Sequence, residues 1–329
     1  MGAIPSEMTV IEISAPGGPE VLKPARRQVP RPVAGEVLIR VAAAGVNGPD
    51  LMQRKGLYPP PAGAPDLLGL EVSGEIVAVG DQVKRWSVGD KVCALANGGG
   101  YAQYCTVAAQ HCLPIPQGVS LSDAGGLPET FFTVWSNVFI GAGLHAGQTF
   151  LVHGGAGGIG TTCIQLGKAF GAKVIATDSP EQRCQICRDL GADRVIDYKV
   201  EDFVEVVRKE GGANVILDIV GGPNIERNIK AAAPDARIIQ LAFALGSTVE
   251  INLMPVMLKR LTYTGSTLRT RPVEFKTRVA QDLEVKVWPH IESGRIRVVT
   301  HRTFALADAA QAHALMESAG HVGKILLVP

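Results

Sequence analysis

Apolar positions follow two different patterns along this chain, and the pattern changes near residue 120. Before that point, short β-forming segments alternate with turns that contain Gly and Pro. The segments are "MTVIEI", "EVLIRVAAAGV", "GLEVSGEIVAVG", "DKVCALA" and "YAQYCTVAA". Frequent short strands with turn residues between them are typical of a barrel-like all-β unit. We therefore predict such a unit for the first part of the chain.

From Phe150 onwards, apolar strand-like runs alternate with amphipathic helical runs. The predicted strands cover residues 150–154, 173–177, 194–197, 214–219, 236–242 and 261–265. The predicted helices between them cover residues 159–170, 180–190, 201–210, 224–232 and about 253–259. Six strands separated by helices favour an α/β fold with a doubly wound parallel sheet.

The chain after Ser266 does not continue this alternation. The elements predicted there are a long helix (about 272–293), a β segment (297–306), a helix (307–319) and a terminal strand (323–329). We expect this tail to return to the first domain and complete it. Two domains are expected in any case, because 329 residues exceed what one hydrophobic core usually organises. The predicted boundaries are 1–125 and 268–329 for the first domain and 126–267 for the sheet domain.

Composition and charge exclude several classes of function. The 32 basic residues are balanced by 31 acidic ones without a basic block, so nothing indicates nucleic-acid binding. No apolar stretch reaches the ~18–20 residues that span a bilayer. The first 14 residues lack the apolar segment of an export signal. The six scattered cysteines show no disulfide-framework spacing, which predicts a cytoplasmic protein.

A glycine-rich loop lies between the first predicted strand of the sheet domain and its first helix. Gly155, Gly157 and Gly160 match the pattern GxGxxG within "LVHGGAGGIGTTC". In such loops the first glycine permits a tight turn, the second lets a pyrophosphate approach the backbone, and the third lets helix and strand pack closely. We predict that residues 155–160, including Ala156, Gly158 and Ile159, hold a dinucleotide at the helix N-terminus. The alternative is a merely tight strand–helix turn.

The second predicted strand ends in an acidic residue at the distance that a dinucleotide fold requires. Asp178 lies 18 residues beyond Gly160, where a carboxylate can accept hydrogen bonds from the adenosine ribose. A carboxylate there repels a 2′-phosphate and so favours NAD. Ser179 and Arg183 follow, however, and an arginine can bind such a phosphate bidentately. The local signals for NAD(H) and NADP(H) therefore conflict.

With these motifs in place, the whole chain resembles the medium-chain dehydrogenase/reductase superfamily, in particular its zinc-free quinone oxidoreductase (zeta-crystallin-like) family. The segments that carry the resemblance are "GVNGPDLMQRKGLYPPP", "LLGLEVSGEIVAVG", "VGDKVCAL", "GGGYAQYCTV", "LPETFFTVW", "HGGAGGIGTTCIQLGKAFGA", "VIDYKVEDF" and "HVGKILLV". "LMQRKGLYPPP" and "GSTLRTR" are most similar to the subgroup that contains the tumour-suppressor-induced quinone oxidoreductase. The resemblance implies a chaperonin-10-like β-barrel catalytic domain, a Rossmann domain, an active site in the cleft, and a homodimer formed by edge pairing of sheets. The apolar segment "LTYTGST" suits such an edge.

The positions that ligate zinc in other members of the superfamily carry different residues in this chain. The matched positions are Asn47, in place of a cysteine, and Leu70-Glu71, in place of a His-Glu pair. A catalytic zinc needs about three protein ligands and an open position, so no metal is predicted. Without a Lewis acid, reduction of an electron-poor acceptor such as a quinone or a similar conjugated carbonyl is the expected chemistry.

The resemblance also implies three residues near the reacting atoms. The Asn47 amide can bind a carbonyl oxygen, although "NGPD" also suits an Asx turn. Tyr58 is expected at the mouth of the active site, where it either donates a proton or stacks on the acceptor ring. Thr133, in "TFFTVW", matches a position beside the nicotinamide, and its alternative role is a hydroxyl on the helix surface.

Further cofactor contacts are predicted at Tyr198 near the adenosine, Phe243 after the fifth strand of the sheet, and Lys324 near the cleft. Relatives that use NADPH often carry Gly-Ser and then a lysine after the second strand. This chain has Arg183 at the place of that lysine and Asp178 before the serine. We expect NADP(H), with NAD(H) as the alternative because of Asp178.

Three functions are compatible with these features. The first is an NAD(P)H-dependent quinone oxidoreductase. The second is an enoyl reductase that acts on α,β-unsaturated thioesters or ketones with Tyr58 as the proton donor. The third is a dinucleotide-binding protein without catalysis, as some lens crystallins of this family are. The identity of the quinone or enone depends on loop shapes that residue spacing does not reveal.

Overall fold

The computed structural model describes residues 3–329 and divides into two compact units. The first unit contains the chain up to Phe132, together with Arg269–Gly294 and Val298–Pro329. The second contains Thr133–Leu268 and the short segment Arg295–Arg297. Among residues 3–329, no helix is both long enough and apolar enough to cross a membrane.

The second unit is built on one six-stranded parallel sheet. Its strands are β8 (Thr149–His153), β9 (Lys173–Asp178), β10 (Arg194–Asp197), β11 (Ala213–Asp218), β12 (Ala232–Gln240) and β13 (Thr262–Gly265). They lie in the order β10-β9-β8-β11-β12-β13, and every neighbouring pair is parallel. Counted along the unit this is 3-2-1-4-5-6, the order of a doubly wound dinucleotide-binding sheet. The predicted fold class is confirmed.

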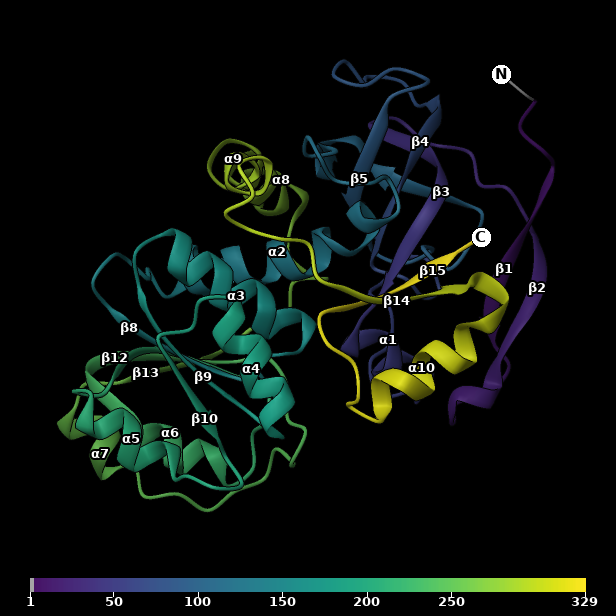
Figure 1. Cartoon of the computed structure of the whole chain (residues 1–329). Coiled ribbons are helices and arrows are strands. Elements are labelled where there is room, and N and C mark those ends of the chain that lie inside the picture. The colour runs from purple at the N-terminus through teal and green to yellow at the C-terminus, as the bar shows by residue number, and fades with distance from the viewer. Residues whose placement is uncertain (1–2) are drawn as a thin grey trace. The chain divides into compact units, whose positions relative to one another are not determined.

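Helices cover both faces of this sheet (Figure 1). They are α3 (Gly158–Ala169), α4 (Glu181–Asp189), α5 (Phe203–Lys209), α6 (Asn224–Ala231) and α7 (Met254–Leu258). In Figure 1, α3 and α4 lie on one face, and α5, α6 and α7 lie on the other. With both faces covered, the central strands read as continuous apolar runs, as in the fully buried β8.

Apolar side chains from neighbouring strands form the core of the second unit. Leu151 of β8 is in register with Ile175 of β9 on one side and Ile216 of β11 on the other. All three side chains are fully buried in one cluster with residues of α5 and α6. The register therefore fixes the carboxyl ends of the strands along one edge of the sheet, where the glycine loop begins.

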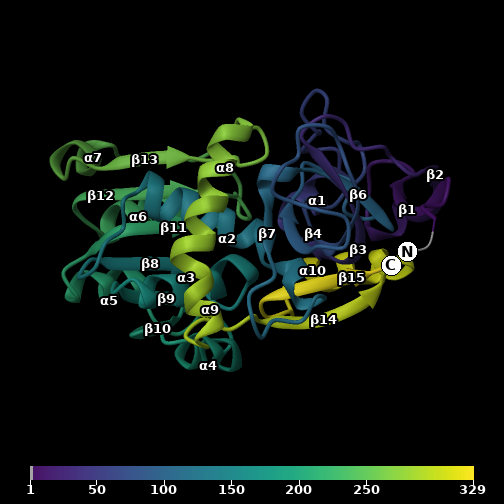
Figure 2. The ribbon, with the colours of Figure 1, turned by 90° about the horizontal axis from the view of Figure 1, so that it is seen from above.

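The first unit contains a seven-stranded, mainly antiparallel sheet. Its strands are β3 (Glu36–Val46), β4 (Glu71–Val79), β5 (Lys91–Leu95), β6 (Tyr104–Ala108), β7 (Cys112–Pro114), β14 (Thr300–Ala305) and β15 (Lys324–Val328). The strand order is β14-β15-β3-β4-β5-β7, and β6 also pairs with β3. Figure 2 shows the yellow strands β14 and β15 side by side, and β15 pairs with β3. The C-terminal tail is thus part of the same sheet as the N-terminal strands.

The remaining elements of the first unit surround this sheet. The helices are α1 (Gly48–Arg54), α2 (Pro128–Val134), which continues into a π-helical turn at Trp135–Gly141 in the second unit, α8 (Val273–Asp282), α9 (Trp288–Glu292) and α10 (Ala309–Glu317). A second π-helical turn (Leu283–Val287) joins α8 to α9, so the single long helix predicted for residues 272–293 is divided into three segments. Short 3-10 turns cover Pro19–Val21, Ala109–His111, Asp123–Gly126 and Leu306–Asp308.

Two strands were not predicted from the sequence, β2 and the three-residue β7. Strand β2 (Leu22–Gln28) pairs antiparallel with β1 (Glu7–Ile13) in a separate two-stranded sheet. Its sequence "LKPARRQ" contains Pro24 and three basic residues, which are unfavourable in a central strand. They are tolerated because β2 has β1 as its only partner among the described strands. Pairing with β1 therefore overrides the local propensity of this segment.

Candidate functional site

The glycine loop joins β8 to α3 in the second unit, and two of its glycines are needed for different reasons. A Cβ atom at position 160 would lie 2.1 Å from the carbonyl oxygen of Gly154, so Gly160 lets the helix pack against the turn. A Cβ atom at position 157 would meet nothing closer than 3.5 Å, which is ordinary contact. Folding alone therefore does not require Gly157, and the bare space beside it fits the approach of a pyrophosphate.

The first turn of α3 supplies the donors of this loop. Gly158, Ile159 and Gly160 form that turn, and the first N–H groups of an α-helix have no partner within the helix. These donors and the positive end of the helix dipole favour a phosphate. The N–H of Ala156 is not among them, because it donates to a carboxylate oxygen of Asp178 at 2.7 Å. The residues present therefore fit a dinucleotide. The N–H of Ala156 is used within the protein, in its hydrogen bond to Asp178.

Asp178 ends β9 beside the glycine loop. Its carboxylate accepts hydrogen bonds from the N–H groups of Ala156 and Ser179 and from the Nε of Arg183 at 2.6 Å. Only 3% of Asp178 is exposed. The hydroxyl of Ser179 is buried and has no hydrogen-bond partner. The structure therefore brings together the three residues that sequence analysis connected with the adenosine ribose.

Two aromatic residues follow the carboxyl ends of strands β10 and β12, which are not adjacent in the sheet. Tyr198 follows β10, is 51% exposed, and its N–H donates to the carbonyl oxygen of Asp178 at 3.3 Å. Phe243 follows β12 and is 45% exposed. Ligands of open α/β sheets bind outside the carboxyl ends of the strands, so both rings are placed where a dinucleotide would contact them.

Thr133 also belongs to the second unit, where it is the penultimate residue of α2. Its carbonyl oxygen accepts hydrogen bonds from the side chains of Ser136 and Asn137. Its side chain is half-buried. Its predicted place beside the nicotinamide remains a prediction.

In the first unit, Asn47, Glu71 and Lys324 form a closed and buried polar cluster. The Lys324 ammonium lies 2.7 Å from Glu71 Oε1 and donates to Asn47 Oδ1 at 2.5 Å. The Asn47 amide nitrogen donates to the same Glu71 oxygen at 2.9 Å. The other Glu71 oxygen accepts from the N–H of Glu129. Asn47 directly follows β3, Glu71 begins β4 and Lys324 begins β15. We call these three hydrogen-bonded residues the Asn47 cluster.

Asp50 fixes the loop that carries this cluster. One carboxylate oxygen accepts from the N–H of Asn47 at 2.9 Å, and the other accepts from the N–H of Gly69 at 3.0 Å. Burial raises the pKa of Asp50 to about 6, and the two N–H donors oppose that rise. Asp50 therefore orders the start of α1.

The Asn47 amide is already engaged at both ends, which bears on its predicted role. Its oxygen accepts from Lys324 and its nitrogen donates to Glu71. Only 5% of the residue is exposed. To bind an acceptor's carbonyl oxygen, Asn47 would have to give up one of these bonds. Binding by Asn47 therefore stays a prediction, while its contribution to holding Glu71 and Lys324 is visible.

These positions do not fit a zinc ion. Leu70 has no ligating atom, Asn47 offers only an amide, and Glu71 is already paired with the Lys324 cation. Within residues 3–329, no group of three or more His, Cys, Asp or Glu side chains is placed to hold a metal ion. In this part of the structure a lysine ammonium supplies the positive charge beside Glu71.

Tyr58 lies near a second group of ionisable side chains in the first unit. The Arg269 guanidinium carbon is 5.9 Å from the centre of its ring. Burial and the nearby Glu129 carboxyl raise the pKa of the Tyr58 hydroxyl, whereas Arg269 opposes this shift. Burial and Glu71 together raise the pKa of Glu129 to about 8. The Tyr58 hydroxyl, which is protonated at neutral pH in any case, is thus a poorer acid here than an exposed tyrosine.

Four residues near these predicted positions were not assigned to the site from the sequence: Glu71, Glu129, Arg269 and Lys276. Lys276 donates to Asn97 Oδ1 and to the carbonyl oxygen of Arg269, and burial lowers its pKa to about 8. Lone charged residues in apolar surroundings were the available signal, as in "LLGLEVSG" and "GLPETFF". Lys276 carries no such signal, because α8 reads as an ordinary amphipathic helix, and Arg269 lies before α8 in the polar segment "TLRTR".

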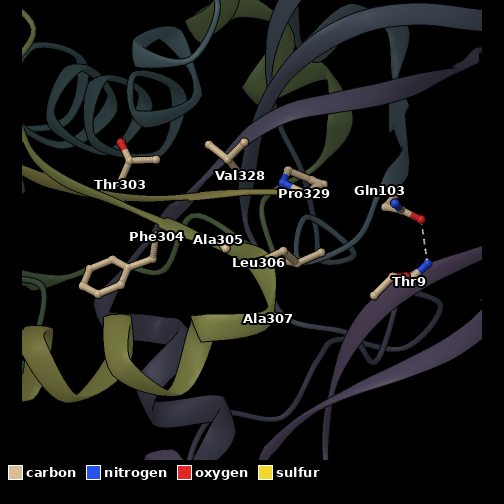
Figure 3. Close-up of a pocket in the computed structure, with 9 residues that line it drawn as sticks. All are labelled: Thr9, Gln103, Thr303, Phe304, Ala305, Leu306, Ala307, Val328 and Pro329. Atoms are coloured by element: carbon tan, nitrogen blue, oxygen red, sulfur yellow. Dashed lines mark hydrogen bonds between the residues drawn. The ribbon is translucent and has the colours of Figure 1, made fainter.

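A cavity of about 580 Å³ lies elsewhere in the first unit (Figure 3). It is lined by Thr9, Gln103, Thr303, Phe304, Ala305, Leu306, Ala307, Val328 and Pro329. Figure 3 shows the hydrogen bond from the N–H of Thr9 to Gln103 Oε1 at its edge. None of the lining side chains is ionisable or belongs to the Asn47 cluster. The cavity is therefore separate from the candidate chemistry.

Comparison with known proteins agrees with this architecture. Residues 33–117 match the alcohol dehydrogenase GroES-like domain, and residues 158–284 match the domain described as zinc-binding dehydrogenase. A quinone oxidoreductase of Pseudomonas aeruginosa is 33% identical over 328 residues, which cover 97% of this chain and 99% of the relative.

Two solved structures are similar over nearly the whole chain. The quinone oxidoreductase of Escherichia coli complexed with NADPH is 30% identical with a TM-score of 0.86, covering 98% of this chain and 100% of the other. The CurK enoyl reductase is 26% identical with a TM-score of 0.86, covering 98% and 99%.

The glycine loop on a doubly wound sheet, combined with a GroES-like unit, defines an oxidoreductase of the medium-chain dehydrogenase/reductase superfamily. The relatives narrow this class further. The chain belongs to the quinone oxidoreductase family.

Proposed function

We propose that this protein reduces quinones or similar conjugated carbonyls with NADPH and without zinc. The observation that carries the proposal is the Lys324–Glu71 ion pair, with 2.7 Å between its charged atoms. Glu71 belongs to the Leu70-Glu71 pair that stands in place of the His-Glu pair of zinc-dependent relatives. A site whose acidic residue is already neutralised by a lysine offers no Lewis acid for alcohol oxidation. Reduction of an acceptor that needs no such activation is the chemistry that remains.

NADPH supplies a hydride when it is bound, and a quinone that accepts a hydride and one proton becomes a hydroquinone. This chain's own residues must hold the acceptor's oxygen and deliver the proton. We assign the first task to the Tyr58 hydroxyl, because a phenol is a hydrogen-bond donor at neutral pH and the resemblance places this tyrosine at the mouth of the active site. Arg269 lies near the ring and restricts its position.

The preference for NADPH rests on two observations. The Escherichia coli relative was solved with NADPH, and Arg183 stands in this chain next to the residue that ends β9. Asp178 keeps NADH as the alternative. Separate titrations of the protein with NADPH and NADH, followed by initial rates on a quinone panel, test the proposal. A protein that binds either nucleotide but turns over no acceptor would instead be a non-catalytic binding protein.

An enoyl reductase is the second candidate, favoured by the placement of Tyr58 near Glu129 and by the similarity to the CurK enoyl reductase. Protonation of an enone's α-carbon requires a positioned acid, which contributes about 10²–10⁴-fold. A quinone requires less help. Tyr58→Phe is therefore expected to lower kcat/KM for enones about 100-fold and for quinones less than about tenfold.

The matched control for this substitution is Tyr104→Phe, a partly buried tyrosine of β6 in another hydrophobic cluster. It should leave both rates within about twofold. Equal losses on quinones and enones in Tyr58→Phe would indicate that Tyr58 positions every acceptor and that the proton comes from another group.

We further propose that two chains associate through the β13 edge of the sheet. All four residues of β13 are exposed, and Tyr263 is 42% exposed. The preceding α7 presents Met254, Met257 and Leu258, each more than half exposed. An unpaired strand edge beside exposed apolar side chains is a surface that a partner covers.

Sedimentation velocity should show twice the mass of the chain, and Met257→Lys with Leu258→Glu should shift the protein to monomer. Val285→Glu is the control, because Val285 is 72% exposed and belongs to the first unit, whereas β13 and α7 belong to the second. A dimer that survives both α7 substitutions would place the interface elsewhere.

We place the protein in the cytoplasm. All six cysteines are free and buried. Burial raises the pKa of the Cys163 thiol, as it does for the other five. Unpaired thiols are typical of proteins in reducing compartments.

A further inference from the structure

The carboxylate of Asp178 has no free hydrogen-bonding capacity. An ionised carboxylate offers about four lone-pair sites. Oδ1 accepts from the N–H of Ser179 at 2.8 Å and from Arg183 Nε at 2.6 Å. Oδ2 accepts from the N–H of Ala156 at 2.7 Å and, more weakly, from Arg183 Nη2 at 3.4 Å. All four directions are therefore used by this chain itself.

Burial also limits the access of a ligand to the Asp178 carboxylate. The Asp178 side chain is 5% exposed and the Arg183 side chain is 16% exposed. A ribose hydroxyl that bound Asp178 would have to displace an internal donor. Removing the N–H of Ala156 or the Arg183 guanidinium would leave a buried polar group unpaired, which is costly.

One of these donors belongs to the glycine loop. Ala156 lies between Gly155 and Gly157 and is completely buried. A Cβ at position 155 would lie 2.7 Å from Cys187 Sγ, so the loop also packs tightly against α4. The bond from Ala156 to Asp178 therefore ties the centre of the loop to the end of β9, 22 residues along the chain.

We propose that Asp178 is a positioning residue that holds the glycine loop through the N–H of Ala156, and that it does not bind the adenosine ribose. The proposal rests on the proposed binding of a nicotinamide dinucleotide at this loop. It reverses the interpretation of Asp178 as the ribose acceptor that the sequence favoured.

The role has a consequence for the choice of cofactor. The positive charge of Arg183 neutralises the Asp178 carboxylate at 2.6 Å, and both groups are shielded from solvent. A paired carboxylate repels a 2′-phosphate far less than a free one does. An acidic residue at the end of β9 therefore does not exclude NADPH in this chain.

Two variants test the proposal: Asp178→Asn and the double variant Asp178→Asn with Arg183→Gln. The double variant is decisive, because it removes the guanidinium that the single variant would free to bind a 2′-phosphate. Measured against Arg183→Gln alone as the reference, which already lacks any guanidinium contact with a 2′-phosphate, we expect the double variant to weaken NADPH and NADH by the same further factor, about tenfold, with the ratio of the two Kd values kept within about threefold. Isothermal titration with each nucleotide measures both constants.

Hydrogen exchange in the nucleotide-free protein provides the second measurement. Exchange of the Ala156 amide should be slow in the unaltered protein and at least about tenfold faster in Asp178→Asn. A residue that only binds ribose would leave this amide unchanged when no ligand is present. Thermal unfolding of each variant verifies that the fold is retained.

Asp193→Asn is the matched control. Asp193 accepts from the N–H of Val174 at 2.7 Å and from Lys168, so it also joins a backbone N–H to a cation, at the opposite end of β9. It should change neither the nucleotide affinities nor the exchange of Ala156.

Relative to Arg183→Gln, a loss of affinity confined to NADH in the double variant, or unchanged affinity for both nucleotides, would overturn the proposal. Unchanged exchange of Ala156 in Asp178→Asn would overturn it as well. Failure of the proposed function is a different result, in which the unaltered protein binds neither nucleotide. The exchange measurement still decides the role of Asp178 in that case.

Discussion

Replacing Lys324 by methionine is expected to lower the free energy of unfolding by about 3–5 kcal/mol, the usual cost of breaking a buried ion pair. The reason is that Glu71 is completely buried and depends on the Lys324 ammonium at 2.7 Å for its charge balance. The oxygen of Asn47 loses its donor at the same time. Urea unfolding of the variant and the unaltered protein at pH 7 measures the difference.

Removing both charges distinguishes the cost of an unpaired charge from the cost of lost side-chain packing. In Lys324→Met with Glu71→Gln, no unpaired charge remains, so at least half of the lost stability should return. Lys168→Met is the control, because Lys168 pairs with Asp193 on the surface, where such pairs contribute about 0–1 kcal/mol. A loss below about 1 kcal/mol in Lys324→Met would show that water or another group neutralises Glu71.

The second large effect is expected at Gly157. Replacing it by valine should leave stability nearly unchanged but weaken dinucleotide binding about 100-fold, or about 2.7 kcal/mol. A Cβ atom at this position meets no protein atom closer than 3.5 Å, so the fold accommodates it. The added side chain fills the space in which the pyrophosphate approaches the backbone. Fluorescence titration with NADPH measures the affinity.

Gly160→Ala is the informative companion, because its Cβ would lie 2.1 Å from the Gly154 carbonyl oxygen and 2.6 Å from Gly155. This variant should lose stability, since the backbone at the start of α3 must move. If Gly157→Val instead binds NADPH as the unaltered protein does, the phosphates do not lie against this loop. The dinucleotide assignment would then be wrong.

The agreement between sequence and structure is closest where the local pattern is also the tertiary requirement. Strands β8 to β13 were predicted within a few residues, and the central strands are the clearest case, because a parallel strand buried on both faces is an apolar run in any context. Strand β2 was missed for the opposite reason. Its pairing with β1 satisfies a backbone whose residues, including Pro24, do not favour a strand.

In the candidate site, too, features set by local sequence were predicted and features set by long-range contacts were not. The glycine loop was found because its function requires glycine at fixed spacing, and this requirement is local. The Asn47 cluster was found only in part, because Asn47 and Lys324 are 277 residues apart along the chain. Glu71 was seen at the position of a missing metal ligand, but its pairing with Lys324 was not foreseen.

The sequence by itself determined the doubly wound sheet, the dinucleotide loop and the family, since each depends on residue type and spacing within short segments. Only the tertiary structure shows that the side chains of Asp178 and Asn47 are already hydrogen-bonded within the chain. Whether a polar side chain is free to bind a ligand depends on which donors surround it. Those donors come from distant parts of the chain: Ala156 is 22 residues from Asp178, and Lys324 belongs to the last strand. Spacing places a carboxylate or an amide, but the folded surroundings determine whether it is already bound.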